Sequence, residues 1–383
     1  MPVVRLRGLG LVSAYGPGVD RAAAGMIAGR TAITPLTLFT VPFQDGIQVN
    51  QLDHTPYPPG EAGALALLGT AVREALTEAG LTTEDLRDTA LVVGTSGFLF
   101  AAEAEYRHRQ AQQDHPPARP ALRAPGYLTQ EFAAQMGMQG PVMTLSTACS
   151  SSANALLVAG GFLRRGDARR ALVIGVEGLS AVTLNGFQSL MLLDPEGCRP
   201  FDAERRGMQL GEAAAAVLLE AEPDPIAYGD VLLGGANLCD IHHVTSASPD
   251  GSAMRAVMEM ALADADVDPD QVTLIKAHGT GSPDNDMAEA AAMRALWGES
   301  LPPFTAIKRY LGHTLGACGA VELAALLGCL RAGAIPPASG CQRPDPELRI
   351  APLRASHPAQ PGVVMFNYFG FGGNYASFLI RHG

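Results

Sequence analysis

The chain has 383 residues, 47% of them apolar and 17% charged, which supplies a large core and argues against disorder. The net charge of −11 opposes the basic face that nucleic-acid binding requires, and no apolar run reaches the ~20 residues that span a membrane. The start carries no signal-peptide pattern, and six scattered cysteines do not form a disulfide framework. We therefore expect a reduced, cytoplasmic protein.

Short apolar runs alternate with amphipathic stretches and turns rich in glycine or proline, a pattern that is typical of layered α/β folds. Residues 3–12 are expected to form a strand. Residues 61–79 are expected to form a helix that ends at Gly80, and residues 90–93 a strand buried on both faces. Residues 107–123 combine Gln, His, Pro and Arg without periodicity, so we expect a mobile surface excursion there.

An internal repeat divides the chain. Residues 74–97 resemble residues 260–281, since each has a helix, an acidic turn, an apolar strand and a Gly-Thr loop. A second pair follows in the same order, residues 142–166 and residues 304–333, each a strand, a loop and a helix. Chance similarity of two α/β segments is the alternative. If the copies stack by pseudo-symmetry, the corresponding loops converge and bring Cys149, His278 and His313 to one site.

Cys149 is the first candidate for chemistry. It lies in Thr-Ala-Cys-Ser-Ser-Ser, between a predicted strand and a predicted helix. The partial positive charge at a helix N-terminus favours a thiolate, and the backbone N–H there is available to an oxyanion. The alternative is a buried small cysteine that only packs. We expect Cys149 to be the most readily alkylated of the six.

Two histidines are the next candidates. His278 lies at a strand end beside glycines that allow a substrate to approach closely, and His313 lies where a helix begins. The helix dipole keeps the His313 ring neutral and able to donate a hydrogen bond. Lys308, five residues earlier, could orient that ring or raise the local positive potential. The alternatives are a structural histidine at position 278 and a surface cation at position 308.

Other polar clusters give weaker signals. Cys239, His242 and His243 lie close in sequence, but no second cysteine pair accompanies them, so we expect no metal site. Asp284, Asp286 and Glu289 are expected to cap the helix that follows His278 rather than to bind a cation.

The C-terminal residues 366–374 form a dense glycine and aromatic turn. The phosphate-binding patterns GxGxxG and Walker A are absent from it. Functional and purely structural readings of this turn both stay open.

Taken together, these motifs resemble the β-ketoacyl-[acyl-carrier-protein] synthases, decarboxylating condensing enzymes of the thiolase superfamily, over nearly the whole chain. The matching segments are, in chain order, 4–16 with 28–33, 147–151, 199–212, 278–283, 308–322 and 369–373. The resemblance implies the α/β thiolase fold, two pseudo-symmetric βαβαβαββ halves in a five-layered αβαβα core. We expect residues 1–240 to carry the nucleophile and residues 241–383 the two histidines.

The resemblance also implies an acyltransferase mechanism without a cofactor or a metal. Cys149 would hold the acyl chain, with the backbone N–H groups of Cys149 and Phe371 as oxyanion hole. His278 and His313 would bind the malonyl thioester oxygen and stabilise the enolate left when CO2 departs, and Lys308 would support His313. The product would be a fatty-acid, polyene or polyketide chain extended by two carbons.

Further roles carry over by position. Phe371 would gate the acyl tunnel, and Arg205 would contact the acidic acyl carrier protein. The substrate-binding positions implied are Thr280, Ser282, Phe369, Gly370 and Gly372. The expected partners are acyl- and malonyl-loaded carrier protein, and a second subunit in a homodimer or in a heterodimer with a related chain.

Departures from the family pattern affect chain length and partner choice. Residues 207–214 read Gly-Met-Gln-Leu-Gly-Glu-Ala-Ala instead of the family's Gly-Phe-Val-x-Gly-Glu-Gly-Ala. An initiating synthase would have Asn at His313, and a thiolase would have a second cysteine within residues 366–374. The remaining alternative is a non-catalytic, chain-length-setting subunit, although such subunits normally lack the nucleophile that this chain keeps in Cys149.

Overall fold

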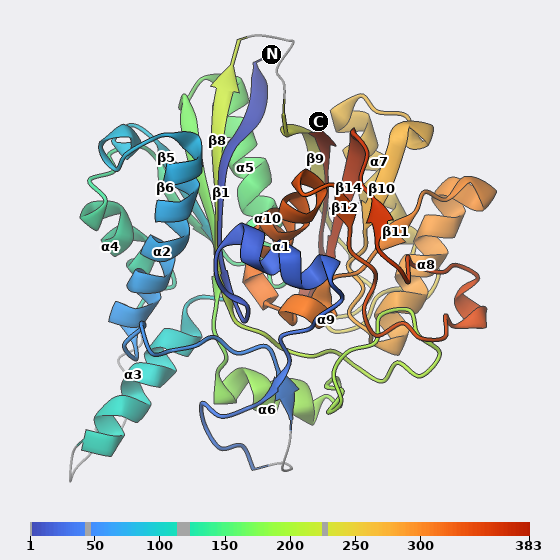
Figure 1. The fold of residues 1–383 in the computed structure, drawn as a ribbon, viewed down its shortest axis with the longest axis horizontal. Coiled ribbons are helices and arrows are strands. Elements are labelled where there is room, and N and C mark those ends of the chain that lie inside the picture. Colours follow the sequence, from blue (N-terminus) through green and yellow to red (C-terminus); the bar gives the residue numbers. More distant parts are fainter. Residues whose placement is uncertain (1, 43–46, 113–122, 224–228) are drawn as a thin grey trace.

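The computed structural model describes residues 2–42, 47–112, 123–223 and 229–383, and its centre is an 11-stranded sheet (Figure 1). The sheet consists of two five-stranded sets, which meet where β1 pairs with β9, and β2 adds to the edge of β1. The first set contains β1 (Val3–Ser13), β5 (Ala90–Gly94), β6 (Val142–Leu145), β7 (Arg170–Glu177) and β8 (Ala213–Glu222). The second set contains β9 (Val231–Cys239), β10 (Val272–Lys276), β11 (Phe304–Thr305), β14 (Gly362–Phe369) and β15 (Asn374–His382).

The two sets have the same topology. Numbered along the chain within each set, the strands lie in the order third, second, fourth, fifth, first. The first three of these strands pair in parallel and the others antiparallel, in both sets. The repeat seen in the sequence is therefore a structural repeat. The boundary after residue 240 stays a prediction, and the strand order groups β9 with the second set.

Alternating side chains assign the layers. Along β8, Ala215 and Val217 face the central core, whereas Ala216 and Leu218 face a second core beneath α2 (Glu61–Ala79). Central helices α5 (Ser151–Arg165) and α10 (Cys318–Arg331) contribute to the central core, which also receives side chains from β14 and β15. Helices α7 (Ser252–Ala265) and α8 (Pro283–Trp297) cover the far face of the second set. The result is five layers, α, β, α, β and α.

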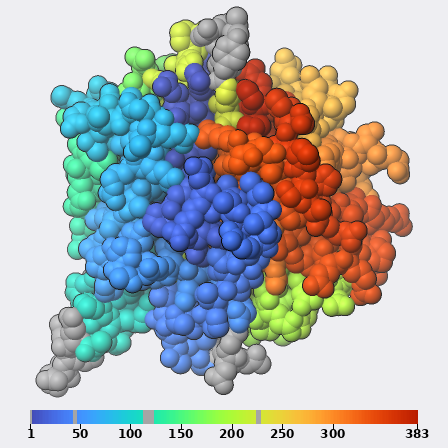
Figure 2. Space-filling model, in the orientation of Figure 1, coloured from blue at the N-terminus to red at the C-terminus, as the bar shows by residue number. Residues whose placement is uncertain are grey.

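The remaining elements surround this core, and the space-filling view shows them closely packed (Figure 2). The other α-helices are α1 (Val19–Ile27), α3 (Leu99–Gln112), α4 (Tyr127–Gln135), α6 (Ala181–Ser189) and α9 (Lys308–Leu311). The short strands are β2 (Gly16–Pro17), β3 (Thr34–Pro35), β4 (Gln48–Val49), β12 (Ala334–Ile335) and β13 (His357–Pro358). Single 3₁₀ turns occupy Glu84–Leu86, Pro269–Gln271, Gly298–Ser300, Leu315–Ala317, Pro346–Leu348 and Phe371–Gly373. Among the described residues, no helix is long and apolar enough to cross a membrane.

Three of the predicted elements are confirmed, and one prediction is partly wrong. The helix over residues 61–79 ends at Gly80, whose φ of 66° is the left-handed helix stop that glycine favours. The strands at the N-terminus and at residues 90–94 are also present. The expected irregular segment is wrong at its start, because residues 107–112 continue α3. Ion pairs one helical turn apart, such as Arg109 with Glu105, support this helix where an apolar stripe is missing, and residues 113–122 lie outside the described residues.

Candidate active site

Cys149 lies in the tight turn that connects β6 to α5. Ala148 before it has a φ of 50°, a strained value for a residue other than glycine. Ser151 holds this turn closed, since its Oγ donates to the carbonyl of Ala148 at 2.6 Å and accepts from the N–H of Thr147 at 2.8 Å. The strain and its clamp together fix the position of the Cys149 sulfur at the start of the central helix α5.

The Cys149 sulfur is more enclosed than the sequence suggested. Burial raises the pKa of the Cys149 thiol to about 11, while Lys308 and hydrogen bonds from the backbone N–H groups of Phe371 and Cys149 act in the opposite direction. The helix N-terminus alone therefore does not yield a thiolate at neutral pH. The two N–H groups at the sulfur are those expected to form an oxyanion hole. A Cβ on Gly370 would lie 3.0 Å from the Cys149 nitrogen, which explains the glycine there.

His278 and His313 come together from the other half of the chain, and the strand end that packs on His278 leads to the Cys149 turn. The rings of Phe369 and His278 have centroids 5.9 Å apart, and Gly370, the next residue, lies against the backbone of Cys149. The ring centroids of His278 and His313 lie 5.6 Å apart and their planes are nearly perpendicular. Burial, and then the positive charge of Lys308, lower the pKa of both rings well below the usual value for histidine. Both rings are therefore neutral around pH 7, and each has one N–H to donate.

The hydrogen bonds of His313 define which ring nitrogen carries the proton. The backbone N–H of Leu315 donates to Nδ1 of His313 at 3.1 Å, and Sγ of Cys318 lies 3.1 Å from the same nitrogen. A nitrogen that accepts a backbone N–H is unprotonated, so the neutral ring carries its hydrogen on Nε2. His313 is thus a hydrogen-bond donor through Nε2.

A buried charged cluster lies behind the histidines. Glu322 on α10 forms salt bridges with both Lys308 and Lys276. Lys308 contacts Sγ of Cys318 at 3.8 Å, so it reaches His313 through this thiol rather than directly. The sequence indicated Lys308, and Glu322 as the end of a segment that matches the family pattern, but it did not indicate Lys276 or Cys318 as part of the site. Lys276 and Glu322 could have been found in the sequence as charged residues inside an otherwise apolar strand and helix, because a charged residue at such a position is buried only when it is paired.

Two carboxylates hold the loop that carries His278. Glu289 accepts the backbone N–H groups of His278 and Gly279 at 2.7 and 2.8 Å, and Asp286 accepts that of Thr280 at 3.1 Å. The prediction that Asp286 and Glu289 cap the following helix is wrong, since both lie inside α8 and reach back to the loop. Buried backbone donors that no strand pairs require such acceptors.

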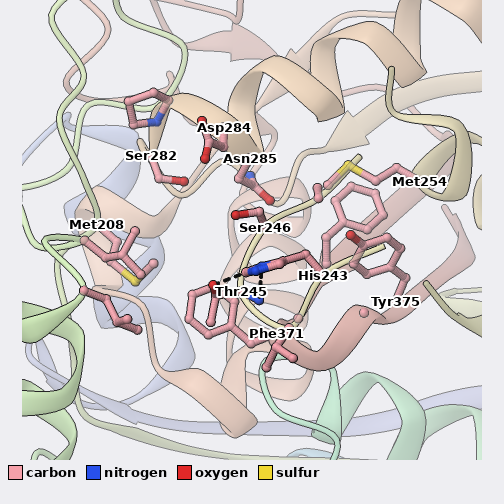
Figure 3. Close-up of a pocket in the computed structure, with 18 of the residues that line it drawn as sticks. Met208, His243, Thr245, Ser246, Met254, Ser282, Asp284, Asn285, Phe371 and Tyr375 are labelled. Atoms are coloured by element: carbon pink, nitrogen blue, oxygen red, sulfur yellow. Dashed lines mark hydrogen bonds between the residues drawn. The ribbon is translucent and has the colours of Figure 1, made fainter. Parts of the chain in front are cut away.

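A cavity of about 330 Å³ opens beside this site (Figure 3). Four of the residues expected to bind substrate or gate it line the cavity, namely Ser282, Phe369, Gly370 and Phe371. The Phe371 ring stacks on Phe187 of α6, with centroids 5.6 Å apart. Gly370 and Phe371 therefore border the cavity, and their backbone also approaches Cys149.

The other expected binding residues lie close to this cavity without lining it. Thr280 is buried, with its Oγ1 3.0 Å from Oγ of Ser282. Gly372 has a φ of 73° and donates its N–H to the carbonyl of Val244 at 2.7 Å, which shapes the loop. Glycine at position 372 thus serves the turn geometry.

Arg205 does not occupy the surface position expected for a carrier-protein contact. It is only 9% exposed, and its guanidinium is held by the carboxylate of Asp345 and by the carbonyl of Asp202. A charge neutralised inside the protein cannot attract an acidic partner, so this prediction is corrected. The neighbouring Arg206 side chain is half exposed but is paired with Asp194.

The exposure of the cysteines changes the expected reactivity. All six are free, and Cys239 is exposed whereas the others are buried. We expect brief treatment with excess iodoacetamide to label Cys239 and Cys149, and to leave Cys198, Cys318, Cys329 and Cys341 unmodified. Burial raises the thiol pKa to about 12 in each of these four, above the value at Cys149. Peptide mass spectrometry measures the order of labelling. Labelling of any of these four buried cysteines before Cys149 would contradict the prediction.

No group of three or more His, Cys, Asp or Glu side chains within the described ranges is arranged to hold a metal ion. Cys239 instead lies 3.6 Å from the carbonyl of Gly372, and His243 accepts the backbone N–H of Thr245 at 3.1 Å. Cys239 thus ends β9, and His243 lies in the following loop, which lines the cavity.

A cysteine at a helix start, two backbone N–H groups at its sulfur and two neutral histidines are groups that a thiol-dependent acyltransferase requires. The sequence matches the "Beta-ketoacyl synthase, N-terminal domain" over residues 64–224 and the "Beta-ketoacyl synthase, C-terminal domain" over residues 228–342. The chain belongs to the β-ketoacyl synthase family, acyltransferases that form carbon–carbon bonds.

Individual relatives match over the full length. A "Putative polyketide beta-ketoacyl synthase 1" of Streptomyces halstedii is 31% identical over 97% of this chain and 96% of its own. A chloroplastic "3-oxoacyl-[acyl-carrier-protein] synthase I" of Arabidopsis thaliana is 28% identical over 97% of this chain and 85% of its own. The solved structure titled "The ishigamide ketosynthase/chain length factor" has a TM-score of 0.88 at 28% identity, and covers 100% of this chain and 99% of its own. The fold is therefore the thiolase fold that the sequence predicted.

Proposed function

We propose that this chain is an elongating β-ketoacyl-acyl-carrier-protein synthase whose chemistry depends on Cys149, His278 and His313. The observation that supports the proposal is that residues 369–371 border the cavity and approach both groups: Phe369 packs on the His278 ring, and the backbone of Gly370 and Phe371 lies at Cys149. In the first step Sγ of Cys149 attacks the carbonyl of an acyl thioester. The acyl group moves to the sulfur, and the carrier thiol leaves with the proton.

The second step forms the new carbon–carbon bond. The malonyl thioester loses CO2, and the electron pair of the broken bond forms an enolate that accepts hydrogen bonds from His278 and His313. The enolate carbon then attacks the acyl-Cys149 carbonyl, and the cysteine sulfur leaves as a thiolate that takes a proton from water. Donors already in place stabilise charge that appears only during the reaction, without reorganisation. Lys308 supports this arrangement through Glu322 and Cys318.

The remaining residues would bind and guide the substrate. Phe371, stacked on Phe187, would gate access from the cavity to Cys149. Thr280 and Ser282, joined at their hydroxyls, would hold the pantetheine arm, and the backbone at Phe369, Gly370 and Gly372 would shape its path.

The proposed partners are an acyl carrier protein, as the name of the Arabidopsis relative indicates, and a second subunit. The solved structure "Ketosynthase (ApeO) in Complex with its Chain Length Factor (ApeC) from Xenorhabdus doucetiae", at 28% identity, pairs two related chains. A homodimer and a heterodimer both fit, and the extended chain would be a fatty acid, a polyene or a polyketide. Six free cysteines fit a cytoplasmic location.

A non-catalytic, chain-length-setting subunit is the second candidate, because two of the similar structures contain a chain length factor. The test incubates the purified protein with acyl-loaded and malonyl-loaded carrier protein and records intact masses. A β-ketoacyl carrier protein longer by two carbons, with a transient acyl adduct on Cys149, is expected. Absence of an adduct with every chain type would favour the non-catalytic subunit.

A further inference from the structure

Lys276 is a fully buried lysine that the mechanism above does not use. It is the last residue of β10, two positions before His278, and its side chain has 0% relative exposure. Its Nζ forms a salt bridge with Glu322, donates to the carbonyl of Asn367 at 2.9 Å and lies 3.7 Å from the centre of the Tyr368 ring. Every direction of the ammonium group is thus occupied by a specific acceptor.

Lys276 and Lys308 meet at one carboxylate, and Glu289 on α8 is a further carboxyl group that acts on Lys276 through its charge. Taking a charge out of water is costly. An apolar side chain at position 276 would leave Lys308 and Glu322 as a neutral pair. The Lys308–Glu322 ion pair is therefore complete without Lys276, and the position of Lys276 behind the histidines points to a role in the site.

Lys276 acts on His278 and His313 in two ways, through a shared aromatic neighbour and through its positive charge. The Tyr368 ring that packs on Nζ of Lys276 also meets the His278 ring edge-on, with centroids 6.5 Å apart. The charge of Lys276 lowers the pKa of both His278 and His313, in addition to the effects of burial and Lys308. A positive charge that disfavours imidazolium at these positions equally favours an anion bound to them.

We propose that Lys276 is a positioning residue for decarboxylation: it keeps a buried positive charge behind His278 and His313, which stabilises the enolate that accepts hydrogen bonds from these rings. This inference rests on the proposed function. It assigns no contact between Lys276 and the substrate. The charge acts through the histidines and across the low-dielectric interior, where such an interaction is strong.

The charge of Lys276 is itself titratable. Burial lowers the pKa of Lys276 to about 8, with Lys308 acting in the same direction and Glu322 against it. The other groups that face the cluster are Cys318 on α10, Glu289 on α8 and Tyr368 on β14. Burial raises the pKa of Glu289 to about 7 and that of Tyr368 well above 10. The pKa of Glu289 lies below that of Lys276, so the charge that this cluster loses above about pH 7.5 is expected to be mainly that of Lys276.

The experiment compares the full-length protein with Lys276→Met, with Lys276→Gln as a second neutral variant and Thr273→Ala, exposed on the same strand, as control. The first readout is the acyl adduct on Cys149 by intact mass. The second is CO2 release from malonyl-loaded carrier protein between pH 7 and 9.5. We expect unchanged adduct formation in all variants, and CO2 release reduced about tenfold at pH 7.5 in both Lys276 variants.

The pH dependence separates a charge effect from a structural one. In the wild type, the rate of CO2 release should fall toward the rate of the variants as the pH rises through about 8. The pH profile of Lys276→Met should lack this decrease. Equal rates and profiles, or a loss that is uniform with pH and accompanied by a lower Tm, would overturn the inference alone. A wild type that neither forms the adduct nor releases CO2 would overturn the proposed function as well.

Discussion

Replacing Cys149 with alanine is expected to abolish acyl transfer and to lower formation of the β-ketoacyl product by at least about 1,000-fold. The variant removes only the sulfur from a side chain that is 5% exposed, so the strained turn at Ala148 and its Ser151 clamp should persist. The backbone N–H groups at the sulfur then have no acyl thioester to polarise. Intact mass after incubation with acyl-loaded carrier protein measures the adduct, and product mass measures the condensation.

Cys329→Ala is the matched control for this prediction. Cys329 is also buried, in the same central layer, but its Sγ lies 3.9 Å from the carbonyl of Ala23 and contacts no residue of the site described above. This variant should form the acyl adduct at the wild-type rate. Product formation by Cys149→Ala at a rate near that of Cys329→Ala would exclude Cys149 as the nucleophile and favour the chain-length-setting subunit.

The grouping of the candidate residues could be predicted from the sequence, because the repeat that places them is visible in local sequence patterns. Apolar periodicity and glycine loops recur in the same order in both halves, so the equivalent turns had to meet if the halves stacked. Cys149, His278 and His313 each lie directly after a strand or before a helix, where a short segment determines the placement. The Cys149 pKa could not be predicted in the same way, because burial, which raises it to about 11, depends on the whole of the opposite half.

Residues whose role depends on distant partners were the ones misassigned or missed. Arg205 lies in a segment with several charges, and only the folded chain shows Asp345 pairing with it. Lys276 and Glu322 are 46 positions apart, so no local pattern links them. The helix α3 was missed because its support comes from ion pairs rather than from an apolar stripe. For Arg205 and Lys276 a long-range contact decides the outcome, and spacing along the chain does not encode it, whereas the support of α3 is local but not apolar.

Replacing His313 with alanine is expected to slow CO2 release from the malonyl thioester by about 100–1,000-fold, which corresponds to about 2.7–4 kcal/mol of transition-state stabilisation. Nδ1 of His313 accepts hydrogen bonds, so the lost group is the single Nε2–H donor for the enolate oxygen. The acyl adduct on Cys149 should still form, since the first step does not use this donor. Rapid-quench measurement of CO2 alongside intact mass separates the two steps.

The pH dependence of this step follows from the pKa directions. The His278 and His313 pKa values lie well below 6.5, so protonation, which would replace a neutral donor by an imidazolium, begins only at pH values well under 6.5. Wild-type CO2 release should therefore show no titration between pH 6 and about 7 from these rings. His357→Ala, at an exposed histidine on β13, serves as control and should match the wild type. A change in rate centred near pH 6.5 that is present in the wild type and absent in His313→Ala would contradict this prediction. It would show that His313 exchanges a proton during turnover and acts by general acid–base catalysis, not as a neutral donor.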